Sequence, residues 1–292
     1  MKDEMKQVIK IIIFAFLVSS LTSCFPTEEL NVPVKEPEDI PRSDLDIYIN
    51  ENYLEEFNIA IRYRYEDRFV DPNERAIPPK IEVVKPMLDF IDEFWIGPYL
   101  EAENGEEFFR THVPSEIVFL GGPIYNVDGT ITLGTADAGA RITFTDVNSV
   151  DPNDEEWRDR QLNVVYHEFS HIVHQRYKLP AGFETITPNG YSGPGSWYTL
   201  TDEEALVRGF VTPYATLNPN EDFAETVAFY LFDSEFAENY TVLETNCSTN
   251  DCEDRNEGRS LIRDKVAAIS SHYEKVTGIN LESLRNIVQS RL

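Results

Sequence analysis

Three of the chain's five histidines lie within eight residues, in the run His167-Glu168-Phe169-Ser170-His171-Ile172-Val173-His174. An α-helix advances about 100° per residue, so His167 and His171 would lie one turn apart on one face and could bind the same ion. Glu168 would lie beside them, where its carboxylate can take a proton from a water that zinc activates. The pattern predicts one Zn²⁺ ion with His167 and His171 as ligands and Glu168 as general base; the alternative is a pair of surface histidines.

A catalytic zinc needs a third protein ligand and one open position. His174 lies on the same helical face, but about 10.5 Å of rise separates it from His167, so an unbroken helix cannot bring all three rings to one ion. We therefore expect His174 to lie behind the ligands or to be structural. Metzincins add a histidine beyond a glycine turn and then a methionine turn, but this chain has only Met1, Met5 and Met87, which disfavours that class.

A later segment offers an acidic ligand. Glu221 and Glu225 are one helical turn apart, so Glu221 can bind the metal while Glu225 holds a ligand histidine from behind. The alternative is an ordinary helix start, in which Asn218 or Asn220 is the cap and the acidic residues offset the helix dipole.

The helix that carries the histidines is expected at residues 155–177, with an apolar face opposite the rings that consists of Leu162, Val165, Phe169, Ile172 and Val173. Hydrophobic spacing and turn residues predict the other elements. A short helix is expected to open residues 43–57, and further helices are expected at residues 86–100, 201–209, 220–232 and 259–292, the last interrupted at Gly278. Strands are expected at residues 59–65, 116–120, 130–133 and 141–145.

These elements predict a single α+β domain at residues 44–292. Its α/β part, 44–154, would form a mixed sheet packed on the histidine helix, and its part 155–292 would be helical. Residues 182–198 could cover the cleft or simply connect two elements. Hydrophobic residues make up 41% of the chain, enough for a packed core, whereas 25 basic against 52 acidic residues give a net charge of −27 that argues against nucleic acid as a ligand.

Residues 1–23 read as a signal peptide, because three lysines precede a short apolar run. Residues 21–24, Leu-Thr-Ser-Cys, resemble the bacterial lipobox, which predicts a lipid on Cys24 and an outer-membrane lipoprotein that faces the periplasm or the cell surface. The alternative is an ordinary signal peptide. Residues 24–43 form an acidic, proline-rich tether. Cys247 and Cys252 are expected to form a local disulfide; a two-cysteine metal clip would lack a second cysteine pair.

The histidine motif, with Glu-Asp-Phe-Ala-Glu at residues 221–225 and Tyr214 seven residues earlier, resembles the gluzincin branch that contains anthrax lethal factor and the Pro-Pro endopeptidases. It is still more similar to the zinc metallopeptidase lipoproteins of Bacteroidetes, which share His-Glu-x-x-His-x-x-His-Gln and a lipobox and are associated with outer-membrane substrate import. The resemblance is best at residues 164–229 and thin before residue 110.

This resemblance implies a zincin-like fold with His167, His171 and Glu221 as zinc ligands. Glu168 would be the general base and later proton donor, Tyr214 would donate a hydrogen bond to the oxyanion, and Glu225 would support a ligand. Asp222 stands where lethal factor has phenylalanine, and His174 has no counterpart there; these departures bear on substrate preference.

The leading hypothesis is hydrolysis of a peptide or protein substrate, with residues 141–145 as an edge strand that pairs with extended peptide. One alternative is a non-catalytic binding lipoprotein of an import complex that keeps the fold. The other is hydrolysis of a non-peptide amide or ester.

Overall fold

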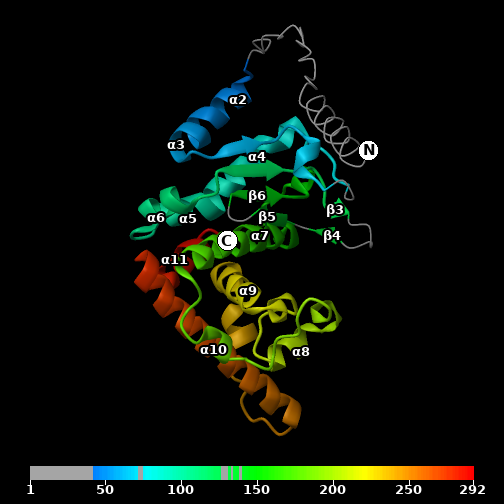
Figure 1. The fold of residues 1–292 in the computed structure, drawn as a ribbon, viewed down its shortest axis with the longest axis vertical. Coiled ribbons are helices and arrows are strands. Elements are labelled where there is room, and N and C mark those ends of the chain that lie inside the picture. The colour runs from blue at the N-terminus through cyan, green and yellow to red at the C-terminus, as the bar shows by residue number, and fades with distance from the viewer. Residues whose placement is uncertain (1–41, 72–74, 126–130, 133, 138–139) are drawn as a thin grey trace, which may run out of the picture. The chain divides into compact units, whose positions relative to one another are not determined.

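The computed structural model describes residues 42–292 except 72–74, 126–130, 133 and 138–139. The predicted signal segment, the lipid site at Cys24 and the tether up to residue 41 lie outside the described residues. Residues 43–292 form one unit, in which helices surround a small sheet (Figure 1). No helix in the described part of the chain combines the length and the apolar character needed to cross a membrane.

The main sheet has the strand order β1-β2-β6-β5. The strands β1 (Ala60–Arg62), β2 (Glu116–Phe119) and β6 (Arg141–Phe144) are parallel, whereas β5 (Gly134–Asp137) is antiparallel to β6. The prediction that residues 141–145 form an edge strand is therefore wrong: β6 is paired on both sides, because the chain runs along the outer side of the sheet in β5 immediately before it enters β6.

The other strand predictions succeeded in part. The strand expected at residues 59–65 is limited to β1, and the one at 116–120 corresponds to β2. Residues Ile131–Thr132 form β4, which pairs with β3 (Ile124–Tyr125) in a separate two-stranded sheet. Residues 130 and 133, at the ends of that prediction, lie outside the described part of the chain.

Two helical segments precede the sheet's inner strands. The first runs from α2 (Asp44–Ile49) through a π-helical turn into α3 (Glu55–Phe57). The second runs from α4 (Ile81–Ile91) through a further π-helical turn into α5 (Gly97–Glu101), and α6 (Gly105–His112) follows. The predicted start of the second segment was five residues late, because Pro86 lies inside α4 rather than at its first turn and the buried Val84 extends the apolar face upstream.

The long helix α7 spans Glu155–Tyr177, and its predicted bounds are confirmed. The side chain of Asp154 caps it by accepting hydrogen bonds from two backbone N–H groups. On the face opposite the histidines, the buried Phe169 ring lies 5.1–5.8 Å, centroid to centroid, from four aromatic rings of the α4–α6 region, those of Trp95, Tyr99, Phe108 and Phe109. This packing fixes the rotation of α7, so that its histidines face the helices that follow in the chain.

The helices after α7 form the other side of the molecule (Figure 1). They are α8 (Asp202–Val207), α9 (Pro219–Phe232), α10 (Asn250–Thr277) and α11 (Leu281–Gln289). The break between α10 and α11 falls at Gly278, as predicted, where φ is +76°. α10 starts nine residues earlier than expected, at a Thr249 cap.

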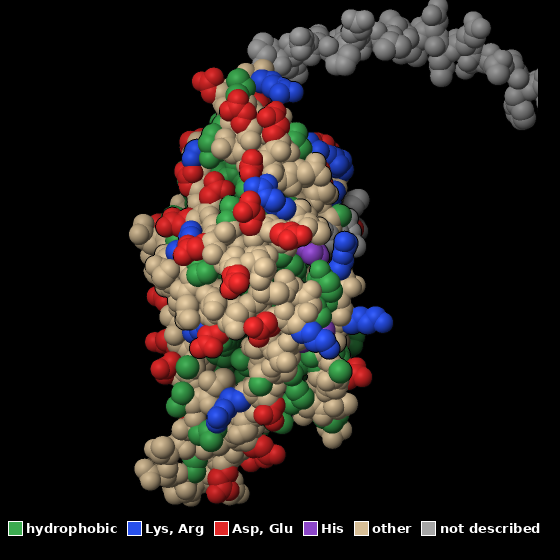
Figure 2. All heavy atoms as spheres, turned by 90° about the vertical axis from the view of Figure 1, so that its left-hand side faces the viewer, with side chains coloured by type: hydrophobic (Ala, Val, Ile, Leu, Met, Phe, Trp, Pro, Cys, Tyr) green, Lys and Arg blue, Asp and Glu red, His purple; other side chains and the backbone are tan. Residues whose placement is uncertain are grey.

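Two local features hold α10 in place. Cys247 and Cys252 form the expected disulfide, which ties the preceding loop to the first turn of α10. At Gly258 the backbones of α8 and α10 approach so closely that a Cβ there would lie 1.9 Å from the carbonyl oxygen of Leu206. The surface is mixed in character: Figure 2 shows acidic and basic side chains scattered over one face rather than gathered in a single basic patch.

Candidate metal centre

Three side chains from α7 and α9 converge on one point. His167 Nε2 lies 2.9 Å from His171 Nε2, and Glu221 Oε2 lies 3.2 Å from the first of these atoms and 3.1 Å from the second. Ligand atoms about 2.0–2.1 Å from a tetrahedral zinc ion are about 3.3 Å apart. The two imidazoles and the carboxylate therefore form a donor set of the chemistry and spacing that a zinc ion requires.

Glu168 lies close to the same two imidazole rings, in a second group of three side chains that could hold a metal ion. One of its carboxylate oxygens and a nitrogen of each of the two rings lie within 4.8 Å of one another. Burial raises the pKa of Glu168, and the neighbouring His167 and His171 only partly oppose this effect. A carboxylate with a raised pKa next to the ion's position is suited to accept a proton.

His167 and His171 each have a partner on the other ring nitrogen. His167 Nδ1 lies 2.8 Å from Glu225 Oε1, and His171 Nδ1 lies 2.7 Å from His174 Nε2. The hydroxyl of Thr212 donates to the second oxygen of Glu225 at 2.6 Å. Such contacts fix the ring orientation and leave both Nε2 atoms turned towards the ion's position.

Burial, and next the charge of His171, lower the pKa of His174 to about 4. His174 is therefore neutral near pH 7, and its Nε2 can accept a hydrogen bond from His171. The structure thus places His174 behind His171 and outside the triangle of donor atoms.

The electrostatics of the triangle favour a bound cation. Burial lowers the pKa of His167, but its hydrogen bonds with Glu221 and Glu225 outweigh that effect and raise the pKa to about 10. Burial raises the pKa of Glu221, but the two imidazole rings outweigh it and bring that pKa well below its usual range. In the absence of metal, a proton on His167 would balance the carboxylates, and zinc must displace it.

At the start of α9, one side chain caps the helix and also holds the backbone of Glu221. Asn218 Oδ1 accepts hydrogen bonds from the backbone N–H groups of Asn220 and Glu221, at 2.8 and 3.2 Å. An ordinary capped helix start and a metal-binding role for Glu221 are thus compatible predictions. The cap uses the backbone of Glu221 and leaves its carboxylate free to face the rings.

Tyr214 lies next to His167, with 5.9 Å between the ring centroids. Burial, followed by the carboxylates of Glu221, Glu225 and Glu168, raises the pKa of Tyr214, so its hydroxyl keeps its proton and remains a donor. The ring of Trp197 also packs against Tyr214, edge to face, with 4.9 Å between the ring centroids.

The segment 182–198 is attached to the short helix that contains Tyr214. The backbone N–H of Ser192 donates to the carbonyl of Thr216 at 2.8 Å, and the hydroxyls of these two residues lie 2.6 Å apart. The segment thus contributes Trp197 to the site's surroundings.

No role was predicted for Thr212, and Trp197 was expected only as part of the segment 182–198 that could cover the cleft. Thr212 lies two residues before Tyr214 and Trp197 lies in a glycine-rich stretch, but neither position carries a local signal for a contact with the site.

A hollow of about 440 Å³ lies between the C-terminal end of α7 and the start of α9. Its walls contain His174, which contacts His171, and Asn220, which precedes Glu221, together with Lys178, Leu179, Pro180, Ala181, Gly182 and Glu184. This hollow has room for part of a substrate.

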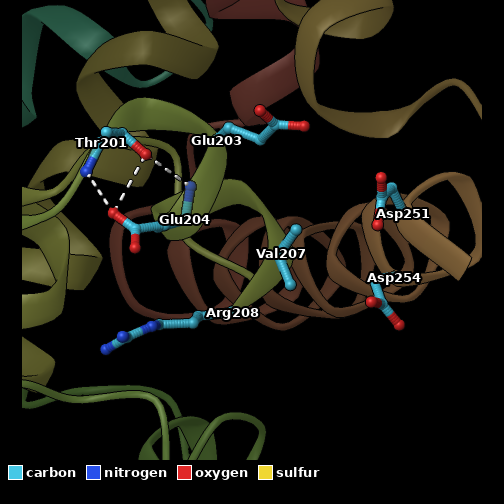
Figure 3. A pocket seen from close by; sticks show the side chains of 7 residues that line it. All are labelled: Thr201, Glu203, Glu204, Val207, Arg208, Asp251 and Asp254. Carbon is cyan, nitrogen blue, oxygen red and sulfur yellow. Dashed lines mark hydrogen bonds between the residues drawn. The ribbon is translucent and has the colours of Figure 1, made fainter.

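A second hollow, of about 380 Å³, lies between α8 and α10 and is lined by Thr201, Glu203, Glu204, Val207, Arg208, Asp251 and Asp254. In Figure 3, Glu204 turns back to Thr201, while the carboxylates of Glu203, Asp251 and Asp254 do not converge on one point. No histidine lines this hollow.

A histidine pair on one helix, joined by a carboxylate from a second helix and flanked by Glu168 and Tyr214, is an arrangement typical of zinc hydrolase sites. The chain belongs to the family described as "Putative zinc-binding metallo-peptidase", whose model matches residues 38–282. It is thus a member of a zinc metallohydrolase family.

The fold is similar to the crystal structure of a protein of the same description from Bacteroides caccae ATCC 43185. The TM-score is 0.69 and the sequence identity is 26%, and the match covers 86% of this chain and 94% of the other. No curated protein matches the chain.

Proposed function

We propose that the protein is a zinc-dependent peptidase with a zincin-like, gluzincin-type HExxH site, in which His167, His171 and Glu221 bind one Zn²⁺ ion. The observation that carries this proposal is the triangle of donor atoms with sides of 2.9, 3.1 and 3.2 Å. Glu221 is 50 residues from His171 in the chain, so the fold has to bring the carboxylate to the rings.

A zinc ion bound there would polarise the scissile carbonyl and lower the pKa of a water molecule towards neutrality. Glu168 would accept a proton from the attacking water and would then donate a proton to the leaving amine. Tyr214, which keeps its proton, donates a hydrogen bond to the oxygen on which negative charge develops. Glu225 and His174 hold the two rings in their orientation throughout.

The edge strand β5 is the place where an extended peptide would pair with the sheet. In the described part of the chain, β5 pairs with β6 on one side only, and it packs near α7. Main-chain hydrogen bonds along such an edge bind extended peptide with little demand on side chains. The hollow beside His174 and Asn220 would then accept one part of the substrate.

The N-terminal sequence supports a location at the cell envelope. We propose that a lipid on Cys24 anchors the protein to the bacterial outer membrane, facing the periplasm or the surface, and that the acidic tether separates the domain from it. Association with an outer-membrane import complex is a further part of this proposal and follows from the family resemblance.

Incubation of the purified protein with a diverse peptide library tests the activity. We expect cleavage that a chelator abolishes and that added Zn²⁺ restores, with about one zinc ion per chain by bound-metal analysis. The matched variant is Glu168→Gln, which should keep its zinc but lose hydrolysis by a factor of about 10²–10⁴, the usual contribution of a general base.

Undiminished cleavage by Glu168→Gln would remove Glu168 from the mechanism. Zinc binding without cleavage of any peptide would favour the binding lipoprotein instead, and chelator-sensitive cleavage of amide or ester substrates alone would favour the non-peptide hydrolase.

A further inference from the structure

A buried ion pair lies behind the metal centre, between α9 and α10. Lys265 and Asp222 are both 0% exposed, and Lys265 Nζ lies 2.8 and 3.0 Å from the two carboxylate oxygens of Asp222. A fully buried ion pair is costly to desolvate and seldom adds net stability over well-packed apolar residues. The position of Asp222, directly after the proposed ligand Glu221, therefore needs a physical explanation.

Asp222 and Glu221 project from adjacent faces of α9, about 100° apart. Glu221 and Glu225 face the rings of α7, whereas Asp222 faces Lys265 on α10. The rotation of α9 about its own axis decides whether Glu221 reaches both rings. Apolar contacts alone allow small rotations, whereas an ion pair with two short N···O contacts has a defined direction.

Lys265 also holds the chain that leads to Tyr214. Its ammonium donates to the carbonyl of Gly209 at 2.7 Å and lies 3.6 Å from the centre of the Phe210 ring. Gly209 adopts a φ of +85°, which favours glycine. Thr212 and Tyr214 follow within five residues, so one ammonium group contacts both the ligand helix and the segment that carries these two side chains.

Tyr191 completes the cluster from the loop beside the site. Its hydroxyl donates to Asp222 Oδ2 at 2.9 Å, and its ring packs on Phe210 at 5.1 Å. The hydroxyl of Thr226 lies 3.4 Å from Asp222 Oδ1. Every polar atom of the pair therefore has a partner, which is the condition under which a buried polar network adds rigidity.

We propose that Lys265 and Asp222 are positioning residues for the metal centre. They set the rotation of α9 and the path of residues 209–214, so that Glu221, Glu225 and Tyr214 meet the rings of α7 before zinc binds. Neither residue touches the ion's position. This role rests on the proposed zinc site, and it explains why an acidic residue follows Glu221.

The test compares zinc affinity with the stability of the metal-free protein. Lys265→Met leaves Asp222 buried without its partner and should lower the melting temperature strongly. The double variant Asp222→Asn with Lys265→Met buries no charge and should recover most of that stability. Titration with Zn²⁺ against a competing chelator should nevertheless show about 10-fold weaker binding in the double variant, the lower end of what a lost supporting partner costs.

Two further measurements separate positioning from simple stability. Co²⁺ in place of zinc should give a visible spectrum in the double variant that differs from that of the unmodified protein, because the ligand geometry has shifted. Tyr273→Phe is the control on α10: it removes the hydroxyl contact with Tyr99, 3.2 Å long, and should leave zinc affinity and the Co²⁺ spectrum unchanged.

The inference would be overturned if the double variant bound zinc as tightly as the unmodified protein, with the same Co²⁺ spectrum. An unmodified protein that bound no zinc would instead defeat the proposed function itself. If Lys265→Met fails to fold, the double variant and Tyr191→Phe, which removes one hydrogen bond and exposes no charge, give the same comparison with a smaller expected loss for Tyr191→Phe.

Discussion

The helices α8 and α9 begin in the same way and differ in what faces them. Each has a polar cap, Thr201 or Asn218, followed by acidic residues in its first turn. The side chain of Glu221 in α9 is 15% exposed and contacts two imidazole rings, whereas that of Glu203 in α8 is 67% exposed and pairs with Arg255 at the surface. The comparison shows that the local pattern defines a helix start, and that packing against α7 places one of these carboxylates beside two imidazole rings, where we propose that it binds the metal.

Replacement of Glu221 in α9 and of Glu203 in α8 should give the largest difference in zinc binding between the two helices. Glu221→Ala removes one of three donors and should weaken zinc binding by more than about 100-fold, beyond the usual cost of losing a supporting partner. Glu203→Ala should leave zinc binding unchanged. Competition titration with a chelator measures both; equal zinc affinities in the two variants would mean that Glu221 is only a helix-start residue.

Tyr214→Phe tests the donor beside the rings. The ring and its contacts with His167 and Trp197 remain, but the hydroxyl is lost, so zinc content should not change. Hydrolysis should fall by about 10²–10³ in kcat, as for the loss of one oxyanion donor. Steady-state kinetics on a peptide substrate from the library measure this. A kcat within two-fold of the unmodified enzyme's would exclude Tyr214 as a donor to the oxyanion.

The pH dependence of the stability of the metal-free protein should distinguish the metal centre from the hollow between α8 and α10. The raised pKa of His167 means that its ion pair with Glu221 stabilises the fold fully below about pH 6.5 and that this contribution is lost as the pH rises towards about 10. Zinc affinity should increase over the same interval, because fewer protons must be displaced.

Melting temperatures of metal-free protein at several pH values check this. The difference between the unmodified protein and Glu221→Gln should narrow from pH 7 to pH 10, whereas Glu203→Gln should track the unmodified protein. A constant difference for Glu221→Gln would show that no such proton is held.

The smallest effects are expected at the two caps. Asn218→Ala and Thr201→Ala each remove a capping oxygen and should each cost about 1 kcal/mol of stability. Only Asn218→Ala should also weaken zinc binding, because it loosens the turn that carries Glu221. Equal zinc affinities in the two cap variants would mean that the start of α9 is held by tertiary contacts alone.

Elements with strong local signals could be predicted from the sequence. The bounds of α7 follow from an Asp cap and a long apolar face, and the break at Gly278 follows from the left-handed backbone there. The short strands were harder, since a strand of two to four residues carries little periodicity. Strand order is set by tertiary pairing, which is why β6 was wrongly expected at an edge and β5 was not predicted.

For the candidate site too, residues with a local sequence signal could be predicted and residues that depend on tertiary contacts could not. The spacing of His167, Glu168 and His171 on one helix is visible in the sequence, and so is the one-turn spacing of Glu221 and Glu225 on a later helix. The family resemblance supplied Tyr214. The role of Lys265 was not visible, because a lysine in a charged helix reads as a surface residue and its partner Asp222 lies 43 residues away. The contacts of Thr212 with Glu225 and of Trp197 with Tyr214 were missed for the same reason, since they exist only after folding.

Because Gly258 has no side chain, α8 and α10 cross with their main chains in close contact. Where two helices touch through main-chain atoms, no rotamer change can absorb an added methyl group, so Gly258→Ala would have to push the helices apart. Lys265 lies two turns later on the same side of α10, so a displacement of α10 would move Lys265 as well. Residues 258 and 265 lie about 10.5 Å apart along the axis of α10. A lower melting temperature together with weaker zinc binding in Gly258→Ala would show that the spacing of α8 and α10 affects the position of Lys265.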